Sequence, residues 1–222
     1  DWVPITNGSF FMEILVTGTG QPLAEGFASS CSEGYSLRFP PRDQGVDWCD
    51  VETVNDLVAG VDAILHFAPP SVPDKGLEEG DLLDFATRST YVLMQAGSEA
   101  GVGRIVLAST MAMFENYSPD YVIDEIWQPK PSAEAASLAP FLVEMTCREF
   151  ARQGGIAVIC LRFGDLDKAE GTTETDALAA LDGALKMELD PLGYRWHVFH
   201  VYSGKRFPMR AARQKFGLGE IA

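Results

Sequence analysis

The stretch Met12–Ala28, MEILVTGTGQPLAEGFA, decides the fold of this chain. It opens with a short apolar run centred on Ile14–Val16, which is typical of a strand buried on both faces of a parallel sheet. Gly18 and Gly20 then break the strand. Pro22 can take the first position of a helix, because its missing N–H would have no partner there. The sequence therefore predicts a strand, a glycine turn and a helix in direct succession.

This turn is also the first candidate binding site. A strand, a glycine turn and a helix N-terminus together direct free backbone N–H groups and the positive end of a dipole at one place, which suits a pyrophosphate. We therefore expect Thr17, Gly18, Gly20 and Gln21 to contact a dinucleotide. The glycine pattern is imperfect, since Leu23 stands where a third glycine would let helix and strand approach closely. A Rossmann-like glycine turn that has lost its ligand is the alternative interpretation.

Length and composition narrow the choice of partner and compartment. The 222 residues suffice for one well-buried α/β domain, and the net charge of −15 disfavours nucleic acid or an anionic membrane as a partner. No apolar run approaches the ~20 residues that span a bilayer, and residues 1–11 lack a signal-peptide pattern and are expected to be an N-terminal extension. The four cysteines are scattered without a C-x-x-C motif. We expect core thiols in a reducing cytoplasm and no metal site.

Strand and helix patterns alternate along the rest of the chain, which predicts an α/β fold with a Rossmann-like, doubly wound parallel sheet. Residues 12–164 form the expected nucleotide-binding domain, and 165–222 a small C-terminal part that serves as a reduced substrate lobe. Further strands are expected at Tyr35–Phe39, Val46–Cys49, Val61–Phe67, Arg104–Ser109 and Ile156–Phe163. Further helices are expected at Val51–Ala59, Asp81–Ala100, Ala133–Gln153 and Asp176–Met187.

The residue that closes the second strand of such a sheet meets the adenosine ribose. An acidic residue there selects NAD, whereas a nearby arginine accommodates the additional phosphate of NADP. Here two prolines are followed by Arg42, which tilts the interpretation towards NADP. An ordinary exposed turn arginine explains the same residue equally well.

Two further segments lie where a ligand is expected. Asp50 opens a helix as an N-cap. Ala68 and Pro69 turn the chain at the carboxyl end of a buried strand, the edge at which open α/β sheets bind ligands. His66 lies inside that strand and is expected to be a packed core histidine rather than a catalytic one.

Taken in order, several segments resemble the NAD(P)-dependent epimerase/dehydratase family, the extended short-chain dehydrogenases/reductases. The resemblance covers most of residues 12–222, and its pieces are specific only as an ordered set. They are ILVTGTG at 14–20, GVDAILHFAPP at 60–70, AGVGRIVLAST at 100–110, VIDE at 122–125, PKPSAEAAS at 129–137, LRFG at 161–164 and RFPMRAARQKFGLGEI at 206–221.

The resemblance implies roles for individual residues. Asp50, followed by Val51, matches the position that contacts the adenine, and Ala68 matches the residue whose backbone borders the cofactor. Thr110 resembles the serine or threonine that hydrogen-bonds the substrate, although a threonine that only caps a strand end is equally compatible. The cofactor implied is NAD or NADP.

The family's catalytic pair is missing. These enzymes use Tyr-x-x-x-Lys, in which the lysine lowers the tyrosine pKa so that the tyrosine can transfer a proton as hydride moves. In the matching segment Glu134 replaces the tyrosine and Leu138 the lysine, and the chain contains no Tyr-x-x-x-Lys at all. The site therefore departs from its family at the residues that perform the chemistry.

Three functions follow from these observations. The first, which we favour, is an atypical family member that binds NAD(P) with a degenerate catalytic site. The second is an NAD(P)-dependent oxidoreductase or epimerase, acting on a sugar-like or sugar-nucleotide-like substrate, that uses Thr110 with Tyr117, Tyr121 or Glu134 for proton transfer. The third is a structural subunit without a nucleotide. From the resemblance alone, a homodimer is expected through the helices 81–100 and 133–153.

Overall fold

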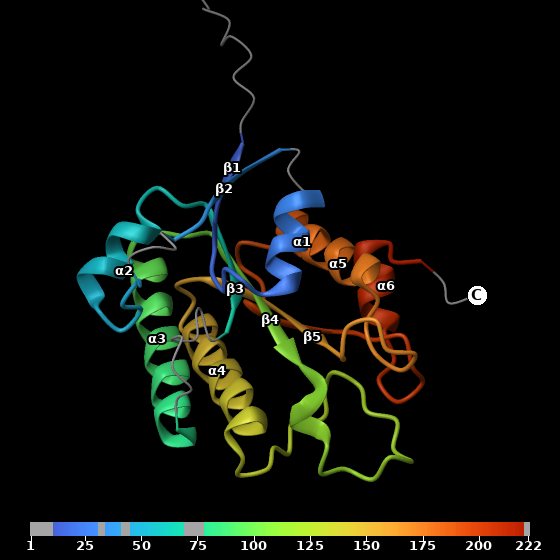
Figure 1. The fold of residues 1–222 in the computed structure, drawn as a ribbon. Coiled ribbons are helices and arrows are strands. Elements are labelled where there is room, and N and C mark those ends of the chain that lie inside the picture. Colours follow the sequence, from blue (N-terminus) through green and yellow to red (C-terminus); the bar gives the residue numbers. More distant parts are fainter. Residues whose placement is uncertain (1–10, 31–33, 41–44, 69–77, 220–222) are drawn as a thin grey trace, which may run out of the picture.

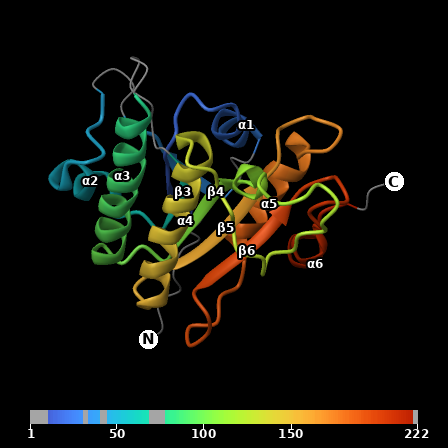
Figure 2. The same ribbon diagram turned by 90° about the horizontal axis from the view of Figure 1, so that it is seen from below.

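A six-stranded parallel sheet with helices on both faces forms the architecture in the computed structural model, which describes residues 11–30, 34–40, 45–68 and 78–219. Helices α2, α3 and α4 cover one face, and α1, α5 and α6 cover the other (Figures 1 and 2). This arrangement confirms the predicted α/β, Rossmann-like fold. The strands are β1 (Met12–Val16), β2 (Tyr35–Arg38), β3 (Ala63–Phe67), β4 (Arg104–Thr110), β5 (Ala157–Phe163) and β6 (Trp196–Val201).

Helices α1 to α5 connect successive strands as crossovers, α6 follows β6, and three of the six begin with a recognisable signal. Pro22 starts α1, and the side chains of Asp50 and Thr173 cap α2 and α5 by accepting hydrogen bonds from backbone N–H groups. The helices are α1 (Pro22–Ser30), α2 (Val51–Val58), α3 (Glu79–Glu99), α4 (Ala135–Arg152), α5 (Glu174–Lys186) and α6 (Arg210–Phe216), with a short 3₁₀ helix, η1 (Met111–Phe114), after β4.

The strand order places the ligand edge. Hydrogen-bonded neighbours run β2-β1-β3-β4-β5-β6, and every pair is parallel. The chain winds outward from β1 to β2 and then returns to place β3 on the other side of β1. This reversal leaves a crevice at the carboxyl ends of β1 and β3, which is where doubly wound sheets bind their ligands.

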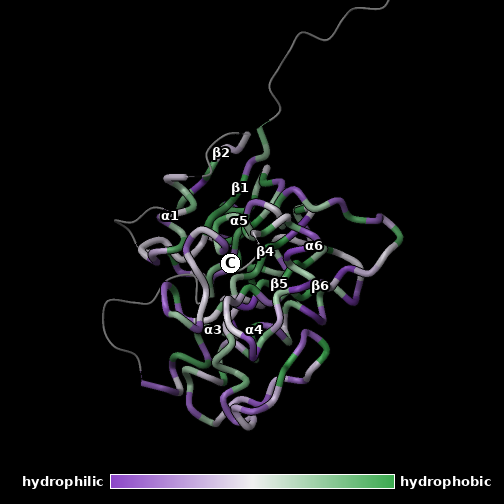
Figure 3. Tube along the Cα trace, turned by 90° about the vertical axis from the view of Figure 1, so that its right-hand side faces the viewer, coloured by the Kyte–Doolittle hydropathy of each residue, from purple (hydrophilic) through white to green (hydrophobic). Residues whose placement is uncertain are grey.

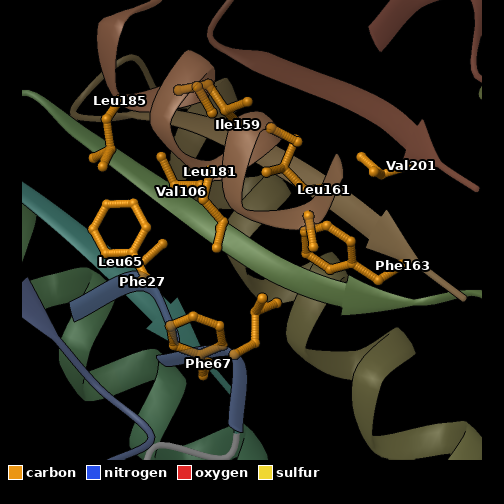
Figure 4. Packing of buried hydrophobic residues seen from close by; sticks show 14 of the residues in the cluster. Phe27, Leu65, Phe67, Val106, Ile159, Leu161, Phe163, Leu181, Leu185 and Val201 are labelled. Carbon is orange, nitrogen blue, oxygen red and sulfur yellow. The ribbon is translucent and has the colours of Figure 1, made fainter. Parts of the chain in front are cut away.

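Two hydrophobic layers hold the helices on the sheet, because successive strand residues point to opposite faces. In β1, Ile14 and Val16 contact the α1/α5/α6 layer, whereas Leu15 contacts the α2/α3/α4 layer. Figure 4 shows Phe27 of α1 and Leu181 of α5 packed over β3, β4 and β5. Apolar residues are concentrated along the central strands in Figure 3, as expected for a sheet covered on both faces.

One predicted strand is wrong and one strand was missed. Residues Val46–Cys49 form no strand: Asp47 accepts hydrogen bonds from Cys49 N (2.9 Å, side chain) and Asp50 N (3.1 Å, backbone), which makes a turn. Val46 and Trp48 alternate because both side chains pack against the hydrophobic core and anchor this turn to it. Trp48 is only 1% exposed. The sixth strand is instead β6, in a region where no strand was predicted.

Candidate functional site

The β1–α1 turn adopts the conformation that its glycines permit. Gly18 has φ +68° and Gly20 φ +98°, both in the left-handed region, and Gln21 N donates to the Gly18 carbonyl at 3.0 Å. A Cβ added to Gly18 would lie 2.5 Å from the Cβ of Phe67 at the end of β3, so this position also requires the absence of a side chain. The turn is thus packed tightly against the neighbouring strand, and α1 begins directly after it.

A buried polar chain fixes the turn to β3. The Thr17 hydroxyl lies 2.9 Å from His66 Nδ1 and accepts a hydrogen bond from Phe67 N at 3.0 Å, while His66 Nε2 lies 3.3 Å from the hydroxyl of Thr90 on α3. Thr17, His66 and Thr90 are all fully buried. Burial lowers the pKa of His66 to about 4, so the ring is neutral near pH 7. His66 is therefore a packed core histidine, as predicted.

A pocket of about 270 Å³ adjoins the crevice at the switch point; Gln21 lines this pocket, whereas Thr17, Gly18 and Gly20 do not. Its walls come from the first turn of α1, the carboxyl ends of β3, β4 and β5, and one face of α4. The pocket is mainly apolar, with few polar groups, as small-molecule sites commonly are. The lining residues are Gln21, Pro22, Leu23, Phe67, Ala68, Ala86, Leu107, Ala108, Ser109, Thr110, Ala139, Pro140, Val143, Phe163, Gly164 and Leu166.

The α4 wall of this pocket offers no proton-transfer group. It consists of Ala139, Pro140 and Val143, none of which is titratable. Across the pocket, Thr110 ends β4, and its hydroxyl accepts a hydrogen bond from Ala112 N at 3.2 Å, which caps η1. The threonine therefore has the capping role and also lies at the pocket. Its hydroxyl proton is available for a ligand.

The other predicted catalytic residues lie outside the pocket lining. Glu134 is exposed at the N-cap of α4 and makes no side-chain cap hydrogen bond, and Leu138 is half-buried. Tyr121 is 51% exposed and stacks on Trp127 with ring centroids 5.8 Å apart. The Tyr117 hydroxyl donates to the Gln128 carbonyl at 2.9 Å. These two tyrosines contribute to the aromatic packing of the loop that follows β4.

The predicted adenine-side residues lie on α2. The Asp50 carboxylate accepts hydrogen bonds from Thr53 N at 2.8 Å and from the Thr53 hydroxyl at 2.6 Å, and these bonds lower the pKa of the carboxyl group. Val51 is 48% exposed at the first helical position. Ala68 borders the pocket at the end of β3. Arg42 and Pro69 lie outside the described residues.

A buried ion pair behind the pocket was not anticipated from the sequence. Glu144 of α4 binds Arg162 of β5 through two hydrogen bonds of 2.9 and 2.7 Å, and their side chains are 0% and 4% exposed. The hydroxyl of Ser109, a pocket residue, donates to the same carboxylate at 2.7 Å. The sequence did contain a signal for this ion pair. Glu144 stands in the apolar stripe of the predicted helix 133–153, and Arg162 stands within the predicted buried strand 156–163.

Comparison with known proteins agrees with this geometry. A family model described as the NAD dependent epimerase/dehydratase family matches residues 27–171. The chain is 32% identical over 119 residues to dTDP-glucose 4,6-dehydratase of Streptomyces niveus, and 30% identical over 121 residues to uronate dehydrogenase of Pseudomonas syringae pv. tomato. The two matches cover 52% and 54% of this chain, but only 34% and 42% of those proteins.

Solved structures show the same fold. The UDP-glucuronic acid 4-epimerase of Bacillus cereus in complex with NAD superimposes with a TM-score of 0.74 at 13% identity, covering 95% of this chain and 94% of that one. No helix among the described residues is both long and apolar enough to cross a membrane. Because the family model matches more than half of the chain, the protein belongs to the NAD dependent epimerase/dehydratase family.

Proposed function

We propose that this protein binds a nicotinamide dinucleotide at the β1–β3 crevice and is an atypical member of its family with a degenerate acid–base centre. One observation carries the proposal: the turn keeps Gly18 and Gly20 in positive-φ conformations directly before α1, whereas the α4 wall of the adjoining pocket presents only Ala139, Pro140 and Val143. The turn supports binding of the diphosphate through backbone N–H groups. The wall lacks the phenol and ammonium groups that would move a proton.

The cofactor would lie with its diphosphate at the first turn of α1 and its reactive end towards Thr110. When bound, it would supply hydride transfer. The roles left to the described residues are positional: Gly18 and Gly20 allow the close backbone approach, Thr17 holds the turn to β3, and Thr110 can donate a hydrogen bond to an oxygen of a second ligand. We extend the proposal to a preference for NADP on the basis of Arg42, a sequence argument only.

A titration of NAD, NADH, NADP and NADPH into the purified protein tests this proposal. Micromolar binding of at least one dinucleotide is the expected result, and the order of NADPH and NADH affinities decides the role of Arg42. If none of the four binds, the dinucleotide-binding proposal is wrong. The result would then favour a structural subunit without a nucleotide.

An active enzyme is the second candidate, favoured by the pocket itself and by relatives that are named for sugar substrates. Thr110 and a pocket of about 270 Å³ leave space beside the proposed cofactor for a sugar-sized group. Leu166 contributes to that pocket, which supports assigning residues 165–222 as a reduced substrate lobe. The proton-transfer group would have to be Glu134, Tyr117 or Tyr121. Turnover of a sugar or sugar nucleotide that disappears in Tyr121→Phe, Tyr117→Phe or Glu134→Gln would favour this function.

We also propose a homodimer through α3 and α4, which lie side by side on one face of the sheet (Figure 1). Tyr91 of α3 is 53% exposed and packs edge-on against Phe150 of α4, with ring centroids 5.5 Å apart. An exposed tyrosine beside a half-buried phenylalanine suits an interface between identical surfaces. Analytical ultracentrifugation of the wild type and of Tyr91→Glu tests it, because the charge should convert a dimer to a monomer.

A further inference from the structure

A second pocket, of about 340 Å³, lies beside α6 at the carboxyl end of β6. Lys205, Arg210 and Arg213 line it together with Tyr202, and its described lining residues include no aspartate or glutamate. The whole chain has 32 acidic residues and only 17 Lys or Arg residues. A pocket lined by three basic residues and no described acidic residue is therefore unusual for this composition.

The three cations also lack the partners that neutralise basic residues elsewhere in this protein. Lys168 pairs with Asp165 at 2.5 Å, and Lys186 pairs with Asp182 at 2.7 Å. Within the described part of the chain, by contrast, no ion pair involves the side chain of Lys205, Arg210 or Arg213. The three side chains that line the pocket therefore form no ion pair with a described carboxylate, although Glu170 and Asp165 lie near enough to Tyr202 to raise its pKa.

Arg213 gives an independent indication that a ligand belongs here. Its Nε and Nη2 atoms are buried, yet they have no hydrogen-bond partner among the described residues. Buried donors of a charged group are costly to leave unsatisfied, and nearly all such groups in proteins find an acceptor. Rotation of the Arg213 side chain would bring these donors to the pocket that it lines, where a guanidinium can form the bidentate contacts that oxyanions accept.

We propose that this pocket binds a phosphoryl group of a phosphorylated small molecule. A monocarboxylate would leave most of the local positive charge unmatched, whereas a phosphoryl group brings up to two negative charges and three acceptor oxygens. Tyr202 can supply another donor. Burial and the nearby Glu170 raise the pKa of its hydroxyl, which therefore keeps its proton at neutral pH.

The pocket adjoins the proposed dinucleotide crevice without being part of it. A Cβ added to Gly164, which lines the crevice pocket, would lie 2.6 Å from Cδ2 of Tyr202, which lines the basic pocket. A lining residue of one pocket therefore packs against a lining residue of the other. The proposal requires no dinucleotide in the crevice and does not depend on the proposed function.

Calorimetric titration of inorganic pyrophosphate, at constant ionic strength and without dinucleotide, tests this site. We expect submillimolar binding to the wild type and at least a tenfold weaker affinity in both Arg213→Met and Lys205→Met. Lys215→Met is the matched control, because it removes the same charge from α6 at a residue outside the pocket lining, and it should change the affinity less than twofold.

Three outcomes would overturn the proposal. They are no binding of pyrophosphate, an equal loss in all three variants, and binding of gluconate, a carboxylate probe, as tight as that of pyrophosphate. Lys205 is exposed, so Lys205→Met keeps the test decisive if Arg213→Met does not fold. Because the crevice is empty in this titration, failure here leaves dinucleotide binding untouched.

Discussion

Gly18 lies directly against Phe67, so close that a Cβ on the glycine would come within 2.5 Å of the Cβ of the phenylalanine. Two parts of the chain separated by 49 positions therefore determine the turn jointly: β1 and its glycine on one side, and the carboxyl end of β3 on the other. Thr17 reinforces the contact, because its hydroxyl accepts from Phe67 N at 3.0 Å. The proposed phosphate-binding turn is thus a rigid element of the sheet edge.

Replacing Gly18 by alanine should destabilise the protein more than a positive φ alone explains. Gly60→Ala is the matched control, since Gly60 has φ +70°, close to the +68° of Gly18, but open space around its Cα. We expect Gly60→Ala to lower the free energy of unfolding by about 1–2 kcal/mol, and Gly18→Ala by clearly more. Urea denaturation measures both. Equal losses would show that the Phe67 contact has no energetic importance.

Two buried histidines should make the free energy of unfolding fall with pH already below about pH 6.5, before most carboxylates titrate. Burial lowers the pKa of His66 to about 4 and, together with nearby Arg162, that of His200 to about 3. The unfolded state, with histidine pKa values near 6.5, then binds more protons than the folded state below that pH. The stability that the two neutral histidines contribute is therefore fully present above pH 6.5 and is lost progressively as the pH falls towards 4.

His200→Phe isolates this effect. The His200 ring packs against Phe114 and Phe207, and neither ring nitrogen has a hydrogen-bond partner among the described residues. Phenylalanine should therefore fit at small cost at pH 7.5. Between pH 7.5 and 4.5 the variant should lose about 3 kcal/mol less of its unfolding free energy than the wild type does. Parallel pH profiles for the two proteins would contradict the assignment.

The Glu144–Arg162 pair should be expensive to break and cheaper to replace. Glu144→Leu leaves a buried guanidinium without its carboxylate and should cost about 3–5 kcal/mol. The double variant Glu144→Leu, Arg162→Met removes both charges and should cost less than the single variant. Ser109→Ala, which deletes only one 2.7 Å donor to the same carboxylate, should cost about 1 kcal/mol. Chemical denaturation of the three variants and the wild type tests this order, and a double variant at least as destabilised as Glu144→Leu would contradict it.

Introducing a Tyr-x-x-x-Lys pair tests where the proposed degenerate centre lies on α4. Glu134→Tyr with Leu138→Lys follows the register of the sequence resemblance, but neither residue lines the crevice pocket. Ala139 and Val143 have the same i, i+4 spacing, and both line it. We therefore expect dinucleotide-dependent turnover of sugar substrates, measured at 340 nm, only from Ala139→Tyr with Val143→Lys. Activity from the first pair alone would contradict the geometry.

Local signals were strong enough to predict most of the fold. The apolar runs of β1, β3, β4 and β5 and the Pro22 and Asp50 helix starts all lie where the sequence predicted them, because each depends on a few neighbouring residues. Val46–Cys49 failed since alternating Val46 and Trp48 anchor a turn to the core as readily as they form a strand. β6 was missed because its alternation, WHVFHV, includes two histidines and is weakly apolar.

The site was only partly accessible to sequence reasoning. The glycine turn and the pocket residue Thr110 could be located, since each closes a recognisable strand. The face of α4 that meets the pocket could not, because it depends on the rotation of the helix over the sheet, and the structure turns Ala139, Pro140 and Val143 towards it. The basic pocket joins Tyr202 and Lys205 to residues of α6, and no local pattern predicts that convergence.

The central claim is dinucleotide binding at the Gly18 turn, and calorimetric titration of NAD, NADH, NADP and NADPH into the wild type and into Gly18→Ala tests it most directly. We predict micromolar affinity of the wild type for at least one of the four, and at least a tenfold loss in a Gly18→Ala protein whose circular dichroism shows it to be folded. Absence of binding to the wild type, or equal affinity in the folded variant, would contradict the claim.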